Sequence, residues 1–255
     1  MITDPWFYAL AVPAVIILGL AKGGFAGIGV IAVPLMALSV SPVLAASITL
    51  PILIVQDVVS VWAFRKTWDR KILILMLPSA AVGIFAGFAL AAFVKPGAVE
   101  LAVGAVSVVF ALQRLWLERA AAPVVEALPE GLAWRGVLAG IAAGFTSQIS
   151  HAGGPPFQMY VLPKRLARDV FIGTSAIFFA VVNWMKVPAY LALGQFTHQS
   201  LTTSVALLPL AIASTWAGVW LVRRVPGAAF YRVIYLLLIG VGGKLAWDGA
   251  ISLLG

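Results

Sequence analysis

The sequence predicts an all-α polytopic membrane protein that consists of two inverted repeats of five apolar segments each. Three observations predict this fold class: the composition, a set of landmark residues that recurs along the chain, and the placement of the basic residues. Hydrophobic residues make up 62% of the 255 residues and charged residues only 10%, whereas a soluble domain has roughly 25% charged residues. The mean hydropathy is +1.06. Nearly the whole chain is therefore expected to lie in a membrane, with no room for a separate soluble domain.

The predicted segments are rich in glycine and proline, as is typical of helices that pack together in a membrane. They cover residues 6–21, 24–40, 43–64, 72–94, 98–117, 134–150, 155–163, 170–191, 200–222 and 227–253. We assign residues 1–117 to the first membrane repeat, 118–133 to a polar cytoplasmic linker, and 134–255 to the second repeat of one integral membrane domain.

Landmark residues of the first repeat recur in the second at one slowly drifting offset. The pairs are Gly27 and Gly153, Ser47 and Thr174, Gln56 and Asn183, Pro78 and Pro209, Gly87 and Gly218, and Pro96-Gly97 and Pro226-Gly227. An apolar composition alone does not align polar, glycine and proline residues in this way. Because each copy holds an odd number of segments, the second copy is predicted to be inverted relative to the first.

The basic residues predict the orientation of the segments. When the 65–71 loop is placed in the cytoplasm and the segments alternate outward from it, 14 of the 17 Lys and Arg residues lie inside and 3 outside. This split follows the positive-inside rule and places both termini outside the cell's inner membrane. The net charge of +8 is then a topology signal with some attraction to anionic lipid, and no nucleic-acid partner is expected. Lys186, one of the three outer residues, lies a turn beyond Asn183. It either helps to attract anions or, as we expect, snorkels to the outer surface.

Two junctions interrupt the helical pattern at corresponding places in the repeats. Segment seven has about eight residues before the basic loop, or about 12 Å of helix, whereas the hydrocarbon core is about 30 Å thick. Segments one and two are also short, and they meet at Lys22-Gly23-Gly24. We expect each pair of segments to form a helical hairpin whose tip lies within the membrane. Irregular backbone at that depth must be buried in protein or line a polar cavity.

Interrupted segments of this kind indicate a transporter site. Helix ends inside the membrane present free N–H groups and a positive dipole end, which favour an anion. Paired, broken segments in two inverted repeats are typical of substrate sites at the midplane of secondary transporters. A channel-like anion pore and a membrane scaffold that transports nothing are the other classes considered.

Enzymatic and metal chemistry are not indicated. The chain has no Gly-x-Ser-x-Gly, His-Glu-x-x-His or P-loop motif. Two histidines and no cysteine do not make a usual zinc site. We therefore expect no catalytic residues, no metal and no cofactor.

Two motifs carry a resemblance to a known family. The run from Gly27 to Leu35, Gly-Ile-Gly-Val-Ile-Ala-Val-Pro-Leu, followed by Ala45-Ala46-Ser47, resembles the first-repeat motif of the sulfite exporter TauE/SafE family. Gly153-Gly154-Pro155-Pro156, followed by Gly173-Thr174-Ser175, resembles its second. The glycine runs differ from the family pattern, because Ile28 interrupts the first and two prolines follow the second. The resemblance implies a secondary transporter that exports sulfite, organosulfonates or related small anions, and uptake coupled to protons or sodium is the alternative.

The candidate substrate-binding residues lie at the two hairpin tips and on the segments that follow them. They are Lys22, Gly23, Gly24, Gly27, Ser147, Gln148, Ser150, His151, Gly153 and Gly154, together with the symmetric amide pair Gln56 and Asn183. Because an inversion axis brings equivalent midplane positions together, we expect Gln56 and Asn183 on opposite sides of one shared cavity.

Three ionisable residues carry alternatives. Lys22 either binds the anion at a hairpin tip or lies in a cytoplasmic loop. His151 is an anion ligand, a proton carrier or a buried histidine that the backbone satisfies. Asp57, the one carboxylate well inside a segment, either carries a coupling proton or pairs with a lysine or arginine.

Overall fold

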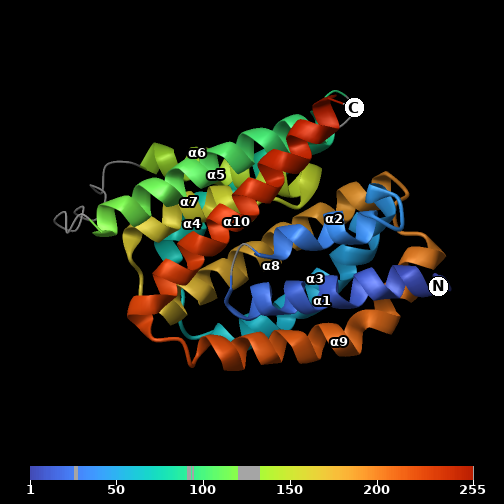
Figure 1. The fold of residues 1–255 in the computed structure, drawn as a ribbon, viewed down its shortest axis with the longest axis horizontal. Coiled ribbons are helices and arrows are strands. Elements are labelled where there is room, and N and C mark those ends of the chain that lie inside the picture. The colour runs from blue at the N-terminus through green and yellow to red at the C-terminus, as the bar shows by residue number, and fades with distance from the viewer. Residues whose placement is uncertain (26–27, 91–92, 94, 120–132, 255) are drawn as a thin grey trace.

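The computed structural model describes residues 1–25, 28–90, 93, 95–119 and 133–254, and within these ranges the ordered elements are all helices. Figure 1 shows the helices lying side by side. Their bounds are α1 Pro5–Gly23, η1 Ile28–Ile31, α2 Ala32–Ala37, α3 Pro42–Phe64, α4 Arg70–Leu90, α5 Pro96–Arg119, α6 Ala133–Ser150, α7 Gly154–Val161, η2 Leu162–Lys164, α8 Arg168–Ala192, α9 His198–Val222 and α10 Gly227–Leu254. The all-α prediction is confirmed.

Six helices of the described part are long and apolar enough to cross a membrane. They lie in α1, α3, α4, α8, α9 and α10. The first predicted segment is therefore longer than expected, because α1 has 19 residues, or about 28 Å of helix. The second segment, 24–40, breaks into the short elements η1 and α2.

Local sequence explains where several of these helices begin. Asp4 caps α1 by accepting a hydrogen bond from the Trp6 N–H, and Ser41 caps α3 in the same way through Leu44. A proline stands in the first turn of both helices, where its missing N–H costs nothing. These caps and prolines determine where α1 and α3 begin.

The helices pack in five main pairs: α5 with α10, α4 with α6, α1 with α9, α3 with α9, and α3 with α8. Glycines make three of these contacts close. A Cβ atom on Gly144 of α6 would lie 2.1 Å from the Ala80 carbonyl oxygen of α4, and one on Gly23 of α1 would lie 2.5 Å from Gly218 of α9. Small residues at such crossings are the usual way in which membrane helices approach each other.

Each of these main pairs has a counterpart when every helix is exchanged for its equivalent in the other predicted repeat. The contact of α1 with α9 becomes that of α6 with α4, and α3 with α9 becomes α8 with α4. The pairs α3 with α8 and α5 with α10 map onto themselves. This pattern supports the predicted inverted repeat, which itself stays a prediction.

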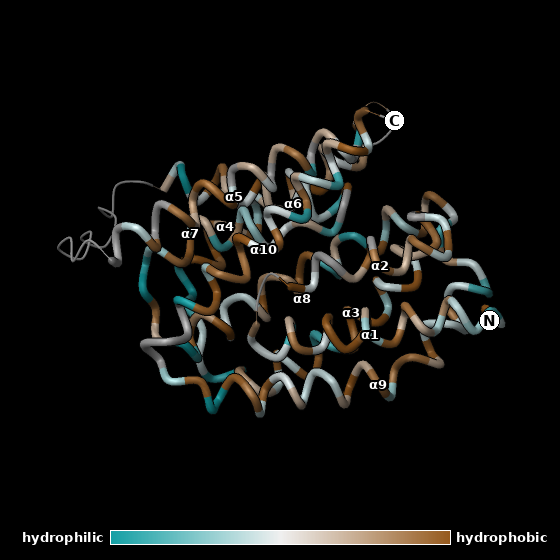
Figure 2. The backbone as a smooth tube through the Cα atoms, in the orientation of Figure 1, coloured by the Kyte–Doolittle hydropathy of each residue, from teal (hydrophilic) through white to brown (hydrophobic). Residues whose placement is uncertain are grey.

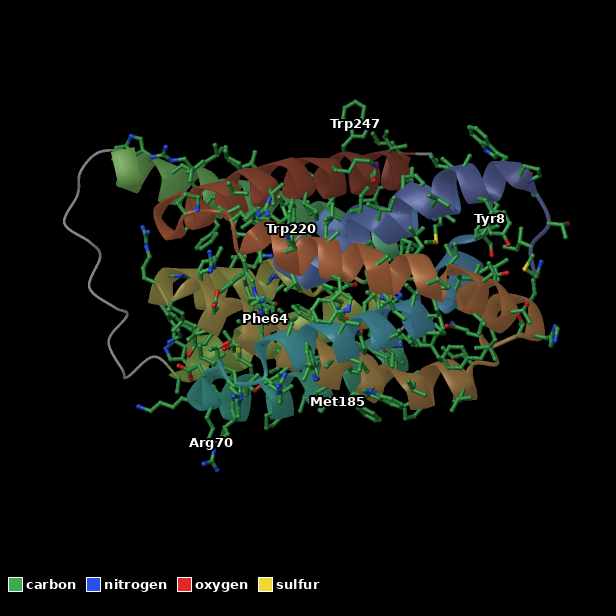
Figure 3. All side chains as sticks on the ribbon, turned by 90° about the horizontal axis from the view of Figure 1, so that it is seen from below. Tyr8, Phe64, Arg70, Met185, Trp220 and Trp247 are labelled. Carbon is green, nitrogen blue, oxygen red and sulfur yellow. The ribbon has the colours of Figure 1, made fainter. Side chains whose placement is uncertain are left out.

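The surface of the bundle is apolar along its length and basic at one end. All nine Trp side chains are at least 41% exposed, and Trp247 extends outward from α10 in Figure 3. The N-terminus and the end of α10 lie at one end of the bundle (Figure 1). Hydrophilic residues gather at the opposite end, on the left in Figure 2. The described basic residues at helix ends there are Arg65, Lys66, Arg70, Lys71, Arg135, Lys164, Arg165, Arg168, Arg223 and Arg224.

Two helical hairpins enter the bundle from opposite ends (Figure 1). The first consists of α1, η1 and α2, and α1 stops at Gly24, whose φ of 143° only glycine adopts readily. The second consists of α6 and α7 and turns at His151, whose φ is 53°. The eight-residue α7 passes into η2 and stops at Arg165, which also has a positive φ. As expected, α7 is too short to cross a membrane.

Candidate functional site

A cavity of about 100 Å³ lies between the two hairpins and the helices α3 and α8. Its polar lining residues are Lys22, Thr49, Ser147, His151, Gln158, Ser175, Asn183 and Lys186. Its apolar wall includes Leu18, Val33, Leu53, Ile172 and Phe179. The two hairpins, α3 and α8 thus contribute both polar and apolar side chains to one small chamber.

Lys22 and Asp57 form an ion pair at the edge of this cavity. Lys22 stands in the last turn of α1, and its Nζ lies 2.5 Å from Asp57 Oδ1 on α3. Asn183 of α8 donates to the other carboxylate oxygen at 2.7 Å. Asp57 is 2% exposed and the Lys22 side chain 14%. Of the two alternatives for Lys22, the structure selects the hairpin tip, and it pairs Asp57 with a lysine.

A second lysine faces the cavity from α8. Lys186 is 1% exposed, and its Nζ lies 3.0 Å from His151 Nδ1. The Tyr190 hydroxyl lies 2.9 Å from His151 Nε2. When Lys186 is protonated it only donates, so Nδ1 of a neutral His151 accepts that hydrogen bond and the ring hydrogen on Nε2 is donated to the Tyr190 hydroxyl. The hairpin turn at His151 is therefore tied to α8 through both ring nitrogens.

The inward position of Lys186 corrects the expectation that it snorkels to the outer surface. The α8 residues that line the cavity are Ile172, Ser175, Ala176, Phe179, Asn183 and Lys186. Their spacing of three and four residues places them on one face of the helix. Lys186 follows Asn183 by three residues and so shares its face. This three-residue spacing from Asn183 is the signal in the sequence that indicates an inward position for Lys186.

The charges around the cavity favour an anion. Lys22 and Lys186 contribute two positive charges, and Asp57 contributes one negative charge. With a neutral His151 the difference is one positive charge. No Asp or Glu lines the cavity itself in the described part of the chain, so an oxyanion would meet cations and neutral polar groups.

Six of the predicted site residues line the cavity: Lys22, Gly24, Ser147, His151, Gly154 and Asn183. Others lie elsewhere. Gln148 packs against α4, where a Cβ on Gly87 would lie 3.0 Å from the Gln148 Cβ. Gly23 packs against Gly218 of α9.

Gln56 lies next to the cavity's ion pair but does not line the cavity. Its amide nitrogen lies 3.4 Å from the carbonyl oxygens of Val15 and Ala211. Asn183 bonds to Asp57, the chain neighbour of Gln56. Of the symmetric amide pair, only Asn183 lines the cavity, whereas Gln56 is directed toward α1 and α9. The two amides therefore do not lie on opposite sides of one shared cavity.

The remaining predicted residues hold the second turn or lie outside the described structure. A Cβ on Gly153 would lie 2.7 Å from the Ala143 carbonyl oxygen, so this glycine lets the turn pack onto α6. Ser150 ends α6, and its side chain lies outside the described part. Gly27 lies outside the described residues as well.

Gln158 is a cavity residue that the sequence analysis missed. It stands on α7, is 1% exposed, and lines the cavity. Among the described residues, neither its amide oxygen nor its amide nitrogen has a hydrogen-bond partner. A buried amide without partners costs free energy unless a ligand or water satisfies it. No cluster of three or more metal-ligating side chains was found in the described residues.

The chain was compared with protein-family models. Residues 11–245 fit the model described as sulfite exporter TauE/SafE. No curated protein and no solved structure matches the chain.

Proposed function

Because the family match shows that this chain belongs to the sulfite exporter TauE/SafE family, we propose that it exports sulfite, an organosulfonate or a related small oxyanion through the cavity between its hairpins. The family is one of membrane transporters and not of enzymes. The six long apolar helices of the described part fit a multi-pass membrane protein.

The observation that carries this proposal is the pair of lysines around one small buried cavity. Lys186 and Lys22 face the same chamber, and a single carboxylate, Asp57, pairs with Lys22. An anion in the chamber would be attracted by the excess positive charge in a setting with little water to screen it. Gln158 and the hydroxyls of Ser147 and Ser175 would donate to its oxygens.

The size and the apolar wall of the cavity suit a small anion with little or no organic tail. A volume of about 100 Å³ is a few times the roughly 30 Å³ that a water molecule takes up in the liquid. Phe179 and Leu53 are part of the apolar wall, and they would contact the short carbon chain of an organosulfonate.

The charge distribution supports the proposed topology, and the family supports export. We place the basic end of the bundle and the 118–133 linker in the cytoplasm and both termini outside the inner membrane, with the repeats 1–117 and 134–255 inverted. An inside-negative potential favours exit of an anion by about 2.3 kcal/mol per charge per 100 mV. Export of a monoanion then needs no coupling ion.

Flux through proteoliposomes tests the proposal. The purified protein is reconstituted and loaded in turn with radiolabelled sulfite, sulfate, sulfoacetate or taurine. We expect saturable efflux and counterflow of at least one of them, and a decrease of about tenfold or more in Lys186→Met, because a charge-assisted contact contributes about 1.5–3 kcal/mol. Lys244→Met on α10, whose side chain is 46% exposed, is the matched control.

Three outcomes contradict the proposal. A non-saturable flux without counterflow indicates a pore. Flux that requires a proton or sodium gradient and runs inward indicates coupled uptake. The absence of flux for every anion in the panel removes the transport function.

A further inference from the structure

The Lys22–Asp57 pair has a geometry that a purely structural ion pair does not need. Lys22 lines the cavity, whereas Asp57 is not among its lining residues and lies behind the lysine. Asn183 holds the second carboxylate oxygen in place at 2.7 Å. The carboxylate is therefore fixed from one side and faces a flexible cation on the other.

We propose that Asp57 is an internal counter-anion, which neutralises Lys22 in the empty carrier and releases it to the substrate anion when the cavity fills. This inference rests on the proposed anion export. It gives Asp57 a positioning role for the empty state, which differs from carrying a proton.

Lys22 already faces both its carboxylate partner and the cavity wall. Its four-carbon stem is flexible, and its Nζ lies 5.4 Å from the centre of the Phe179 ring on the cavity wall. An aromatic face attracts an ammonium group at that distance, so the lysine has a second favourable contact on the side of the cavity. The other lysine cannot exchange partners in the same way, because no carboxylate of the described residues lies within ion-pair distance of Lys186 and it bonds to His151.

The charge arithmetic explains what the counter-anion achieves. With Asp57, the empty site carries two lysine charges minus one, or +1, and the site loaded with a monoanion carries 0. Without Asp57 the empty site carries +2, and a bound monoanion lowers this charge to +1. An unpaired buried charge is costly to hold away from water. We therefore expect an empty carrier that lacks Asp57 to stop reorienting, while the loaded one still moves.

The test compares net efflux with anion exchange for the same reconstituted protein. In Asp57→Asn, efflux into anion-free medium should fall at least about tenfold, whereas exchange against external anion should stay within about threefold of the wild type. The double substitution Lys22→Gln with Asp57→Asn returns the empty site to +1 but also removes an anion ligand. Net efflux and exchange should therefore both fall, while the ratio of net efflux to exchange returns to that of the wild type. Asp248→Asn is the control, because Asp248 pairs with Lys244 on α10 outside the cavity.

Each other outcome overturns the inference. Normal net efflux in Asp57→Asn shows that the empty carrier needs no counter-anion. Equal loss of exchange and net efflux, in a monodisperse protein, shows that Asp57 serves another step. If Asp57→Asn does not fold, the double variant decides: a wild-type ratio of net efflux to exchange supports the inference, and exchange without net efflux overturns it. If the wild type moves none of the anions, the proposed function itself fails.

Discussion

At the residue scale, the unpaired amide of Gln158 is the feature that indicates ligand binding in the cavity. It is the cavity side chain whose donor and acceptor both lack partners among the described residues. Other buried amides use at least their nitrogen: the Asn183 amide nitrogen donates to Asp57, and the Gln56 amide nitrogen reaches two carbonyl oxygens, although the Gln56 amide oxygen has no partner among the described residues. An oxyanion in the cavity would accept from the Gln158 amide nitrogen, and a water could also donate to its amide oxygen.

Gln158→Leu should therefore weaken anion binding while leaving the fold stable. We expect the dissociation constant for the transported anion to rise about tenfold, since a hydrogen bond to a charged group contributes about 1.5–3 kcal/mol. The shift of the melting temperature with anion concentration measures this constant. Gln199→Leu, an exposed glutamine in the first turn of α9, should bind like the wild type. Unchanged affinity in Gln158→Leu would place the anion elsewhere.

At the scale of elements, glycines determine how closely the hairpins approach the surrounding helices. The second hairpin contacts α4 through Gly144 and Gly83, and the first contacts α9 through Gly19 and Gly23. Each of these glycines faces a backbone atom or a side chain that a Cβ would overlap. The hairpin tips, and with them Lys22 and His151, are therefore positioned by helix packing and not by their own turns alone.

Gly144→Ala should destabilise the protein through its α4–α6 crossing. The added Cβ would lie 2.1 Å from the Ala80 carbonyl oxygen, and overpacking of this kind costs about 1–3 kcal/mol. A lower melting temperature in detergent and a smaller monodisperse fraction are expected. Gly240→Ala on α10 is the matched control, because nothing lies within 4 Å of its added Cβ. Equal stability of the two variants would contradict the packing assignment.

At the scale of the whole molecule, the positions of the basic residues and of the termini indicate one orientation of the bundle in the membrane. The termini lie at one end of the bundle and Arg70 points away from it at the other (Figures 1 and 3). Helices that pair across the two repeats, such as α1 with α9 and α6 with α4, keep the same partners under exchange of the repeats. The basic end is the one that the positive-inside rule assigns to the cytoplasm.

Cysteine labelling tests this orientation without background, because the chain has no cysteine. Ala133→Cys, at the exposed start of α6, and Gln199→Cys, at the exposed start of α9, lie at opposite ends of the bundle. In intact cells a membrane-impermeant maleimide should label Gln199→Cys, whereas Ala133→Cys should react only after the membrane is opened. The reverse pattern would invert the proposed topology and the export direction argued from it.

The sequence by itself determined the class of the protein, its helices and its two hairpins. Composition and length required membrane helices, glycine at position 24 and the prolines after Gly154 required breaks, and two motifs indicated the family. It also placed Lys22, Ser147, His151 and Asn183 among the candidates that line one cavity.

Only the tertiary structure decided which side of each helix faces that cavity. It turned Lys186 inward, paired Asp57 with Lys22, brought in Gln158, and directed Gln148 and Gln56 toward other helices. The physical reason is that lipid-facing and protein-facing sides of these helices are similarly apolar, so hydrophobic periodicity does not mark the inner face. That choice depends on glycine contacts between segments far apart in the chain, such as Gly144 with Ala80 and Gly23 with Gly218.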